Sequence, residues 1–432
     1  MLIEFSVGNF LSIKDRQTLR MDASSISEHK DQLIDAGRYQ LLRSAVIYGA
    51  NASGKSNVLR AMYVMRGIVT TSVAQSSNAE LFVEPFLLNT ETELAPSYFE
   101  VLFLLDGIRY RYGFEADVKK VQTEWLFESR KKQEKYLFLR NNDGIDVSED
   151  FKEGKGLEDK TRDNALFLAV CDQFNGGTAK LILEEFNGWL PISGIDHGGF
   201  RKTLFKLLDS PPIRDKMAEI ITHFSLGISG IQLQKGDIDD TYLLGHTPED
   251  QQLFFNLLDG KRTTDLMVVH KKYGPSNEPV SDVFFNLKAN ESAGTNKFFD
   301  LLAPLYLALD RGGLLIIDEL DAKLHPLMTQ AIIRLFNDPM LNSSNAQLIF
   351  ATHDTNLLTY GGFRRDQIYF TEKDQYGATC LYSLVEYQEE NGDKVRKDRS
   401  YEKDYIQGRY GAIPFIGDLR NSHWHGTKNK DH

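Results

Sequence analysis

The sequence has few cysteines, no long apolar run and no excess of basic residues. Cys171 and Cys380 are the only cysteines among its 432 residues, too few for a disulfide framework or a cysteine-based zinc site, and we expect both to be buried thiols. No run approaches the ~18 apolar residues of a membrane-spanning helix. The first residues lack the basic region and apolar core of a secretory signal. These absences predict a cytoplasmic protein that does not enter a membrane.

The charge balance is acidic. The chain has 61 acidic and 50 basic residues, a net charge of −11, which argues against coating by nucleic acid but leaves room for a local basic groove. The best basic clusters, Arg364-Arg365 and 396–399, are short, and we expect them to be solvated. With 41% hydrophobic and 26% charged residues, the composition is typical of a globular protein of two or three domains.

The most specific motif is a glycine-rich loop after an apolar run, 44–48, and before a helical pattern, 57–69. It fits G-x-x-x-x-G-K-[ST], and its candidate phosphate-binding residues are Gly49, Asn51, Ala52, Ser53, Gly54, Lys55, Ser56 and Asn57. Backbone N–H groups and a helix N-terminus favour phosphate oxygens, and the lysine adds a positive charge. The serine hydroxyl of Ser56 is a candidate ligand of Mg²⁺. The motif therefore predicts ATP and Mg²⁺ as cofactors.

The pattern along the chain predicts an α/β protein whose nucleotide core is split. Strand-like runs at 82–88, 97–105, 108–116, 122–128 and 135–139 predict an antiparallel meander, with a hairpin at Asp106-Gly107. Helical patterns at 178–189 and 212–224 predict a mostly helical insertion. Further helices are expected at 296–310 and 324–336, and buried strands at 314–318 and 347–352.

Two acids and a histidine follow the later apolar strands. Asp318 ends one strand and is a candidate Mg²⁺ ligand, and Glu319 beside it can orient the water that attacks the γ-phosphate. His353 ends the next strand and can donate a hydrogen bond to the γ-phosphate, although a structural role is an open alternative. Ser292 and Gly294 precede a helix and form a candidate anion site for a second subunit, or else a plain N-cap.

The order of these motifs resembles the ABC-type ATPase heads of the SMC, RecF and OLD group. Within that group the chain is similar to the stand-alone bacterial AAA15/AAA21-like ATPases over nearly all residues from 1 to about 416. The resemblance implies an ABC-ATPase head, that is a P-loop fold, with an antiparallel β subdomain and a mostly helical insertion. It implies domains at 1–175 (first half of the core with the β lobe), 176–265 (insertion), 266–390 (second half of the core) and 391–432 (C-terminal extension).

The resemblance also implies roles for single residues. The glycine-rich loop resembles a Walker A motif, and Asp318 and Glu319 resemble a Walker B aspartate and a catalytic glutamate. Ser292 and Gly294 resemble the signature motif, here Ser-Ala-Gly-Thr-Asn instead of Leu-Ser-Gly-Gly-Gln. Asp321 resembles the D-loop residue and His353 the switch histidine. Gln173 is the best candidate for a Q-loop, with a buried or turn glutamine as the alternative.

The implied function is an ATP-driven switch. Such heads clamp ATP between the Walker loop of one copy and the signature of another, as a dimer or a larger ring, and hydrolysis loosens them. Relatives control a separate effector, often a TOPRIM-type or other nuclease, in anti-phage defence; PARIS-type systems release theirs when a phage-encoded protein triggers them. A DNA-binding repair ATPase, a self-contained OLD-type nuclease and a scaffold with little turnover are the alternatives.

Overall fold

The computed structural model describes residues 1–131, 133–193, 198–224, 226–236, 263–388, 395 and 399–413. The chain forms two compact units. The first comprises 1–187 and 349–432, and the second comprises 188–348. Most of the expected C-terminal extension and the middle of the expected insertion lie outside the described residues, so the domain boundaries stay a prediction.

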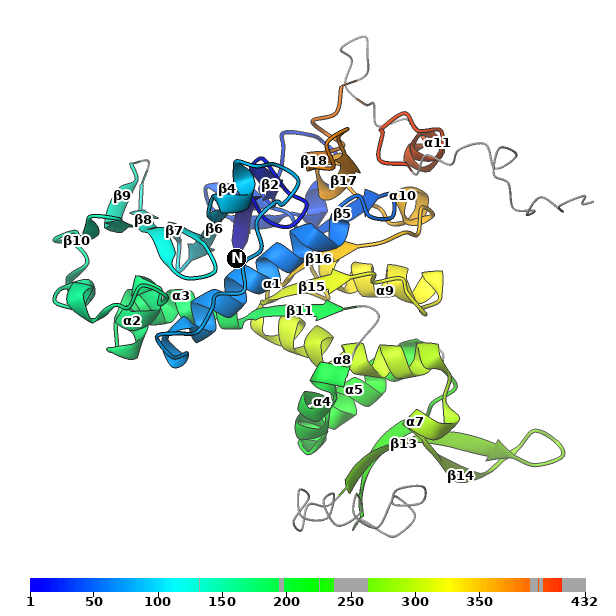
Figure 1. Ribbon diagram of the computed structural model, residues 1–432. Helices are drawn as coiled ribbons and strands as arrows, with labels where there is room; N and C mark the ends of the chain where they lie inside the picture. Colours follow the sequence, from blue (N-terminus) through cyan, green and yellow to red (C-terminus); the bar gives the residue numbers. More distant parts are fainter. Residues whose placement is uncertain are drawn as a thin grey trace, which may run out of the picture. The chain divides into compact units, whose positions relative to one another are not determined.

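A seven-stranded sheet in the first unit has the order β10-β9-β8-β7-β6-β1-β2, and all its neighbouring strands are antiparallel (Figure 1). Its strands are β1 (Leu2–Gly8), β2 (Gln17–Arg20), β6 (Ser97–Leu105), β7 (Ile108–Ala116), β8 (Val121–Ser129), β9 (Lys135–Asn141) and β10 (Gly144–Val147). Asp106 and Gly107 both have positive φ, as a two-residue hairpin turn requires. The predicted meander is confirmed at these strands.

A second group of strands in the first unit includes the strand that precedes the glycine-rich loop. β5 (Ser44–Gly49) is buried along its whole length and pairs in parallel with β17 (Ile368–Lys373), which pairs antiparallel with β18 (Thr379–Ser383). The remaining elements of this unit are β3 (Ile34–Ala36), β4 (Tyr39–Leu41), α1 (Lys55–Thr71), α2 (Phe167–Gln173), α3 (Gly177–Asn187), α10 (Leu357–Tyr360) and α11 (Tyr401–Ile406). Its single-turn 3₁₀ helices are η1 (Lys30–Gln32), η2 (Ser72–Ala74), η3 (Thr92–Leu94), η4 (Lys152–Gly154), η5 (Glu158–Lys160) and η8 (Arg365–Gln367).

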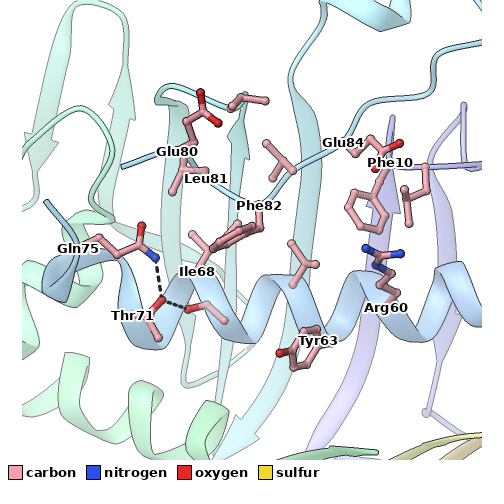
Figure 2. Close-up of a pocket in the computed structure, with 15 residues that line it drawn as sticks. Phe10, Arg60, Tyr63, Ile68, Thr71, Gln75, Glu80, Leu81, Phe82 and Glu84 are labelled. Carbon is pink, nitrogen blue, oxygen red and sulfur yellow. Dashed lines mark hydrogen bonds between the residues drawn. The ribbon is translucent and has the colours of Figure 1, made fainter. Parts of the chain in front are cut away.

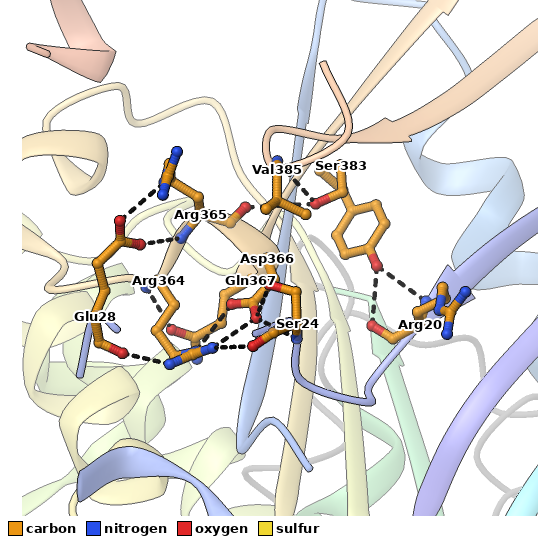
Figure 3. A network of polar contacts seen from close by, with 10 residues as sticks. Arg20, Ser24, Glu28, Arg364, Arg365, Asp366, Gln367, Ser383 and Val385 are labelled. Atoms are coloured by element: carbon orange, nitrogen blue, oxygen red, sulfur yellow. Dashed lines mark hydrogen bonds and ion pairs between the residues drawn. The ribbon is translucent and has the colours of Figure 1, made fainter. Parts of the chain in front are cut away.

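A buried ionic network fastens an N-terminal loop to the start of β17 (Figure 3). Arg364 is fully buried, and its guanidinium donates to both carboxylate oxygens of Asp366 at 2.8 and 2.9 Å. It also donates to the backbone carbonyls of Ser24 and Glu28, and Arg365 pairs with the Glu28 carboxylate. The expectation of a solvated Arg364-Arg365 cluster is therefore wrong, because both cations are used in packing two distant segments together.

The second unit combines a parallel strand pair with helices and a small sheet. β11 (Trp189–Ser193) pairs in parallel with β15 (Leu314–Asp318), whose first four residues are buried. β12 (Gly230–Gly236), β13 (Thr263–Tyr273) and β14 (Pro279–Asn286) form an antiparallel sheet. Its helices are η6 (Gly198–Phe200), α4 (Arg201–Leu208), α5 (Pro211–His223), α7 (Leu287–Asn290), α8 (Ala293–Arg311) and α9 (Pro326–Asn337), and the chain returns to the first unit through β16 (Gln347–Ala351).

The structure differs from the expectations at three further places, two in secondary structure and one in the exposure of a cysteine. Residues 82–88 form no strand, and Phe82 within them is 79% exposed. The stretch 176–265 contains strands β11, β12 and the start of β13 beside its helices, because the apolar runs there pair with one another or with β15. Cys171 is buried as expected, whereas Cys380 is exposed on β18. Among the described helices, none combines the length and apolarity needed to cross a membrane.

Candidate functional site

The glycine-rich loop joins β5 to α1 and can only be built with glycine at two positions. Gly49 has φ of 156° and Gly54 has φ of 111°. A Cβ on Gly49 would lie 2.5 Å from the Ser53 and Thr371 side chains, and a Cβ on Gly54 would lie 2.2 Å from the Thr379 hydroxyl. Both positions therefore combine a left-handed backbone with close packing, which only glycine tolerates without strain. The predicted strand–loop–helix is confirmed.

Two threonines of the β17–β18 hairpin hold the underside of this loop. The Ser53 and Thr371 hydroxyls are 2.6 Å apart, and the Thr379 hydroxyl donates to the Ser53 carbonyl at 2.9 Å. The Thr379 hydroxyl is also 2.8 Å from that of Ser12, which accepts a hydrogen bond from the Asn57 amide at 2.6 Å. The loop is thus fixed by two strands that lie more than 300 residues later in the sequence and by Ser12, which lies 45 residues before Asn57.

Lys55 turns its ammonium back over the loop. Nζ donates to the carbonyls of Gly49 at 2.7 Å and Ala50 at 3.1 Å, and the side chain is buried. A fixed positive charge therefore lies beside the backbone N–H groups that begin α1, where the helix dipole also favours an anion. Asn51, Ala52 and Ser56 are exposed on the open side of the loop, and Ala52 has φ of 64°.

His353 follows β16 and lies in a segment that is bonded to the end of β5. The Thr352 N–H donates to the Ile47 carbonyl at 3.3 Å, and the Tyr48 hydroxyl donates to the Asp354 carbonyl at 3.2 Å. Tyr48 directly precedes Gly49, so the structure brings the His353 segment to the strand end from which the glycine-rich loop starts. The His353 side chain itself is exposed.

Gln173 lies elsewhere in the first unit. It is the exposed last residue of α2, and the N–H of Leu166, just before α2, donates to the Ser72 hydroxyl beyond the C-terminal end of α1. The glycine-rich loop is at the other end of α1, which as a 17-residue helix is about 25 Å long. The structure does not bring Gln173 to the loop, and we leave it out of the proposed site.

The second unit carries the two candidate acids on a strained turn. Asp318 is the last residue of β15, and its buried Oδ1 has no hydrogen-bond partner among the residues that the structure describes. Glu319 follows with φ of 55°, and Lys323 has φ of 61°. Non-glycine residues seldom adopt this left-handed backbone, and such residues occur often at functional sites. Asp321 lies within the same turn.

The predicted signature residues begin helix α8. The Ser292 hydroxyl accepts a hydrogen bond from the Thr295 N–H at 3.1 Å, so Ser292 is the N-cap, as the simpler alternative expected. A Cβ on Gly294 would lie 2.7 Å from the Lys323 carbonyl. The helix start and the turn that carries Glu319 therefore touch within one unit, which the sequence patterns did not indicate.

Sequence reasoning also missed Lys297. This side chain on α8 is fully buried, and its ammonium donates to the carbonyls of Glu319 at 3.1 Å, Leu320 at 2.9 Å and Ala322. Burial lowers the pKa of Lys297 to about 8. A signal was available, because Lys297, Leu301 and Leu305 are spaced four residues apart on one buried face of α8.

A large pocket also lies along α1, apart from the glycine-rich loop. It encloses about 600 Å³ between α1 and the segment 80–84, and Phe10, Tyr63, Ile68 and Phe82 contribute to its largely apolar lining (Figure 2). Arg60, Glu80 and Glu84 supply the charged groups at its wall. The residues of the glycine-rich loop do not line it.

Comparison with known proteins gives a family. The chain matches the family described as "AAA domain, putative AbiEii toxin, Type IV TA system" over residues 44–167 and 246–359, more than half of its length. The chain belongs to this family. Membership implies ATP binding and hydrolysis by an ATPase of the AAA/ABC type. The matched ranges contain the glycine-rich loop, the strained turn at Glu319 and His353.

Similar solved structures include an SMC head domain from Thermotoga maritima and cbiO1 from Clostridium perfringens, part of the ABC transporter complex cbiONQ. The first is 13% identical with a TM-score of 0.40 and covers 88% of this chain and 98% of its own. The second is 11% identical with a TM-score of 0.28 and covers 88% of each chain. No curated protein matches the chain.

Proposed function

We propose that this ATPase is a Mg²⁺-dependent switch that pairs head to head around ATP and controls a separate effector in bacterial anti-phage defence. The observation that carries the proposal is the phosphate loop, in which the Lys55 ammonium is held over the carbonyls of Gly49 and Ala50 at the start of α1. This arrangement of charge, glycine backbone and helix N-terminus suits the β- and γ-phosphates of ATP.

The donor groups present suit a magnesium ion. Asp318 offers a buried carboxylate oxygen without another partner in the described part of the chain, and Ser56 offers an exposed hydroxyl in the first turn of α1. Oxygen ligands of this kind are the ones that Mg²⁺ prefers. The bound ion would neutralise charge on the phosphates. In the proposed site Ser56 and Asp318 hold the ion, and the loop residues and Asn57 hold the nucleotide.

The remaining residues act on the γ-phosphate. Glu319 orients the attacking water and accepts its proton, and His353 donates a hydrogen bond to the transferred phosphoryl group. Ser292 and Gly294 of one copy face the nucleotide of another copy, with Asp321 at the seam between them. Association then depends on the γ-phosphate, so hydrolysis weakens the pairing.

The effector role is supported by the family description, which names a putative toxin of a type IV toxin–antitoxin system. We infer that the chain regulates a partner of toxic activity, such as a TOPRIM-type or other nuclease, and that a phage-encoded protein triggers release. Direct binding of DNA, as in a repair ATPase, is the alternative, and the net charge of −11 does not favour it.

The nucleotide site is tested by Lys55→Ala. The variant should lose at least 100-fold in affinity for a fluorescent ATP analogue, because the loop loses its fixed cation. Arg60→Ala, on the exposed face of the same helix, is the matched control and should bind as the parent does. Equal affinity of Lys55→Ala and the parent protein would contradict the assignment of the loop.

Assembly and catalysis are tested by Glu319→Gln. This variant should bind ATP, hydrolyse it at least 100-fold more slowly and accumulate as a larger species in size-exclusion chromatography with ATP and Mg²⁺. Glu184→Gln removes an exposed carboxylate from α3 and should behave as the parent does. A Glu319→Gln protein that turns over normally would place the base elsewhere. Stimulation of turnover by DNA, with no response to a co-expressed effector, would favour the repair alternative.

A further inference from the structure

Helix α8 contacts the turn 319–323, which begins with Glu319, at two points. At one point the backbone of Gly294 lies so close to the Lys323 carbonyl that a Cβ would be 2.7 Å from it. At the other, the Lys297 ammonium reaches the carbonyls of Glu319, Leu320 and Ala322. The two contacts hold both ends of a five-residue turn, 319–323, against the first two turns of one helix.

The turn has little freedom to relax on its own. Glu319 and Lys323, its first and last residues, both have positive φ, with values of 55° and 61°. A backbone in this sparsely populated region persists only when its surroundings enforce it. The Lys297 ammonium donates one hydrogen bond to each of three backbone carbonyls in this turn. The orientation of Glu319 therefore depends on Lys297.

Burying an ammonium group is costly, so its use here needs a reason. Lys297 is fully buried, and desolvation lowers its pKa. The side chain lies five residues after Ser292 on the same helix. A displacement of the helix start would thus be passed directly to the backbone of Glu319, since packed helices move as rigid elements.

We propose that Lys297 is a positioning residue that sets the orientation of Glu319 and couples it to the serine-led start of α8. Contact between Ser292 of one copy and the nucleotide of another copy then adjusts the catalytic glutamate of the copy that supplies the serine. This inference rests on the proposed function, because it assigns Glu319 to hydrolysis and Ser292 to the facing nucleotide. Lys297 itself touches neither ATP nor water in this scheme.

The test compares Lys297→Met with Asp300→Asn. Methionine keeps the length of the side chain and removes its donors. Asp300 is also on α8 and forms a 2.6 Å ion pair with Arg201 of α4; Asp300→Asn weakens this pair and serves as a control for loss of stability. We expect kcat to fall 10- to 100-fold in Lys297→Met with the affinity for ATP unchanged within twofold, and to stay within twofold of the parent in Asp300→Asn.

Turnover is expressed per ATP-binding site, counted with a non-hydrolysable analogue, so that unfolded protein does not contribute. Lys297→Arg keeps a cation with several donors and should recover part of kcat, which a purely apolar packing role would not explain. Ser292→Ala should lower kcat in the parent but have a much smaller effect in the Lys297→Met background, since coupled residues are not additive.

The outcomes separate this inference from the proposed function. A parental kcat in Lys297→Met, or equal effects of Ser292→Ala in both backgrounds, would overturn the positioning role. If Lys55→Ala and Glu319→Gln also turn over normally, the proposed function fails as well. If those two variants behave as expected and Lys297→Met is unimpaired, only the inference about Lys297 fails.

Discussion

Alanine at position 54 gives the sharpest test of the phosphate loop, because the structure fixes both the clash and the backbone strain. The added carbon would lie 2.2 Å from the Thr379 Oγ1, 2.6 Å from its Cγ2 and 2.9 Å from its Cβ. Thr379 cannot simply rotate away, since its hydroxyl is bonded to the Ser53 carbonyl and the Ser12 hydroxyl. Either the loop or the start of β18 must move by roughly 1 Å.

The size of the effect follows from two costs. Forcing an extra carbon into a packed site costs about 1–3 kcal/mol. Holding alanine at φ of 111° costs about 1–3 kcal/mol more. We therefore expect Gly54→Ala to lower the free energy of unfolding by about 2–6 kcal/mol and to weaken binding of an ATP analogue at least tenfold. Urea denaturation followed by circular dichroism measures the first quantity, and fluorescence titration measures the second.

Gly67→Ala is the matched control. Gly67 lies in the same helix α1, and an added Cβ there meets nothing within 4 Å. The same chemical change should therefore stabilise the protein by about 0.5–1 kcal/mol, because alanine is the better helix former. Thr379→Gly removes all three close contacts together with the hydrogen bonds of the Thr379 hydroxyl, so Gly54→Ala should lower the free energy of unfolding less in a Thr379→Gly background than in the parent. Equal effects of the two alanines, or an undiminished effect of Gly54→Ala in the Thr379→Gly background, would refute the reasoning.

Two further predictions concern the buried cations. Arg364→Met should lower the free energy of unfolding of the first unit by about 3–5 kcal/mol in urea denaturation, because the Asp366 carboxylate is left buried without its cation. Adding Asp366→Asn should recover part of this loss. A change below about 1 kcal/mol in Arg364→Met would contradict the prediction. Lys297 has a pKa of about 8 in the folded protein, below the value of 10.5 for a free lysine, so between these values the unfolded chain binds more protons. The difference in free energy of unfolding between the parent and Lys297→Met should therefore shift in favour of the parent from about pH 8 to 10, by at most about 1.4 kcal/mol per pH unit. If this difference does not change with pH across that range, Lys297 does not titrate there.

Local motifs made much of the fold predictable. The glycine-rich motif predicted both the strand before it and the helix after it, and the predicted helix at 57–69 lies within the observed α1 at 55–71. The antiparallel meander was equally clear, since each strand carries its own alternation and the Asp106-Gly107 turn has the expected backbone. Such features depend on neighbours in sequence, which is why they can be read without a structure.

Features that depend on distant partners could not be predicted. Residues 82–88 have strand-like composition but find no strand to pair with, whereas β11 becomes a strand because β15 lies beside it. The sequence predicted Arg364 to be a solvated cation, whereas in the structure its guanidinium is bonded to Asp366 and to two backbone carbonyls. Gln173 was chosen by its place in the order of motifs. The sequence did not show that its helix α2 begins beside Ser72, beyond the end of α1 that lies away from the loop.

The support that Thr379 gives to the phosphate loop also affects when a growing chain can become active. Gly54 and Ser53 leave the ribosome long before Thr379, which completes the packing around them from 325 positions later in the sequence. Synthesis proceeds at about 5–20 residues per second, so the loop waits at least ~15 seconds for this contact. A nascent or truncated chain that ends before β18 therefore lacks both the hydroxyl that binds the Ser53 carbonyl and the side chain that packs on Gly54, and we expect it to bind ATP more weakly than the full chain.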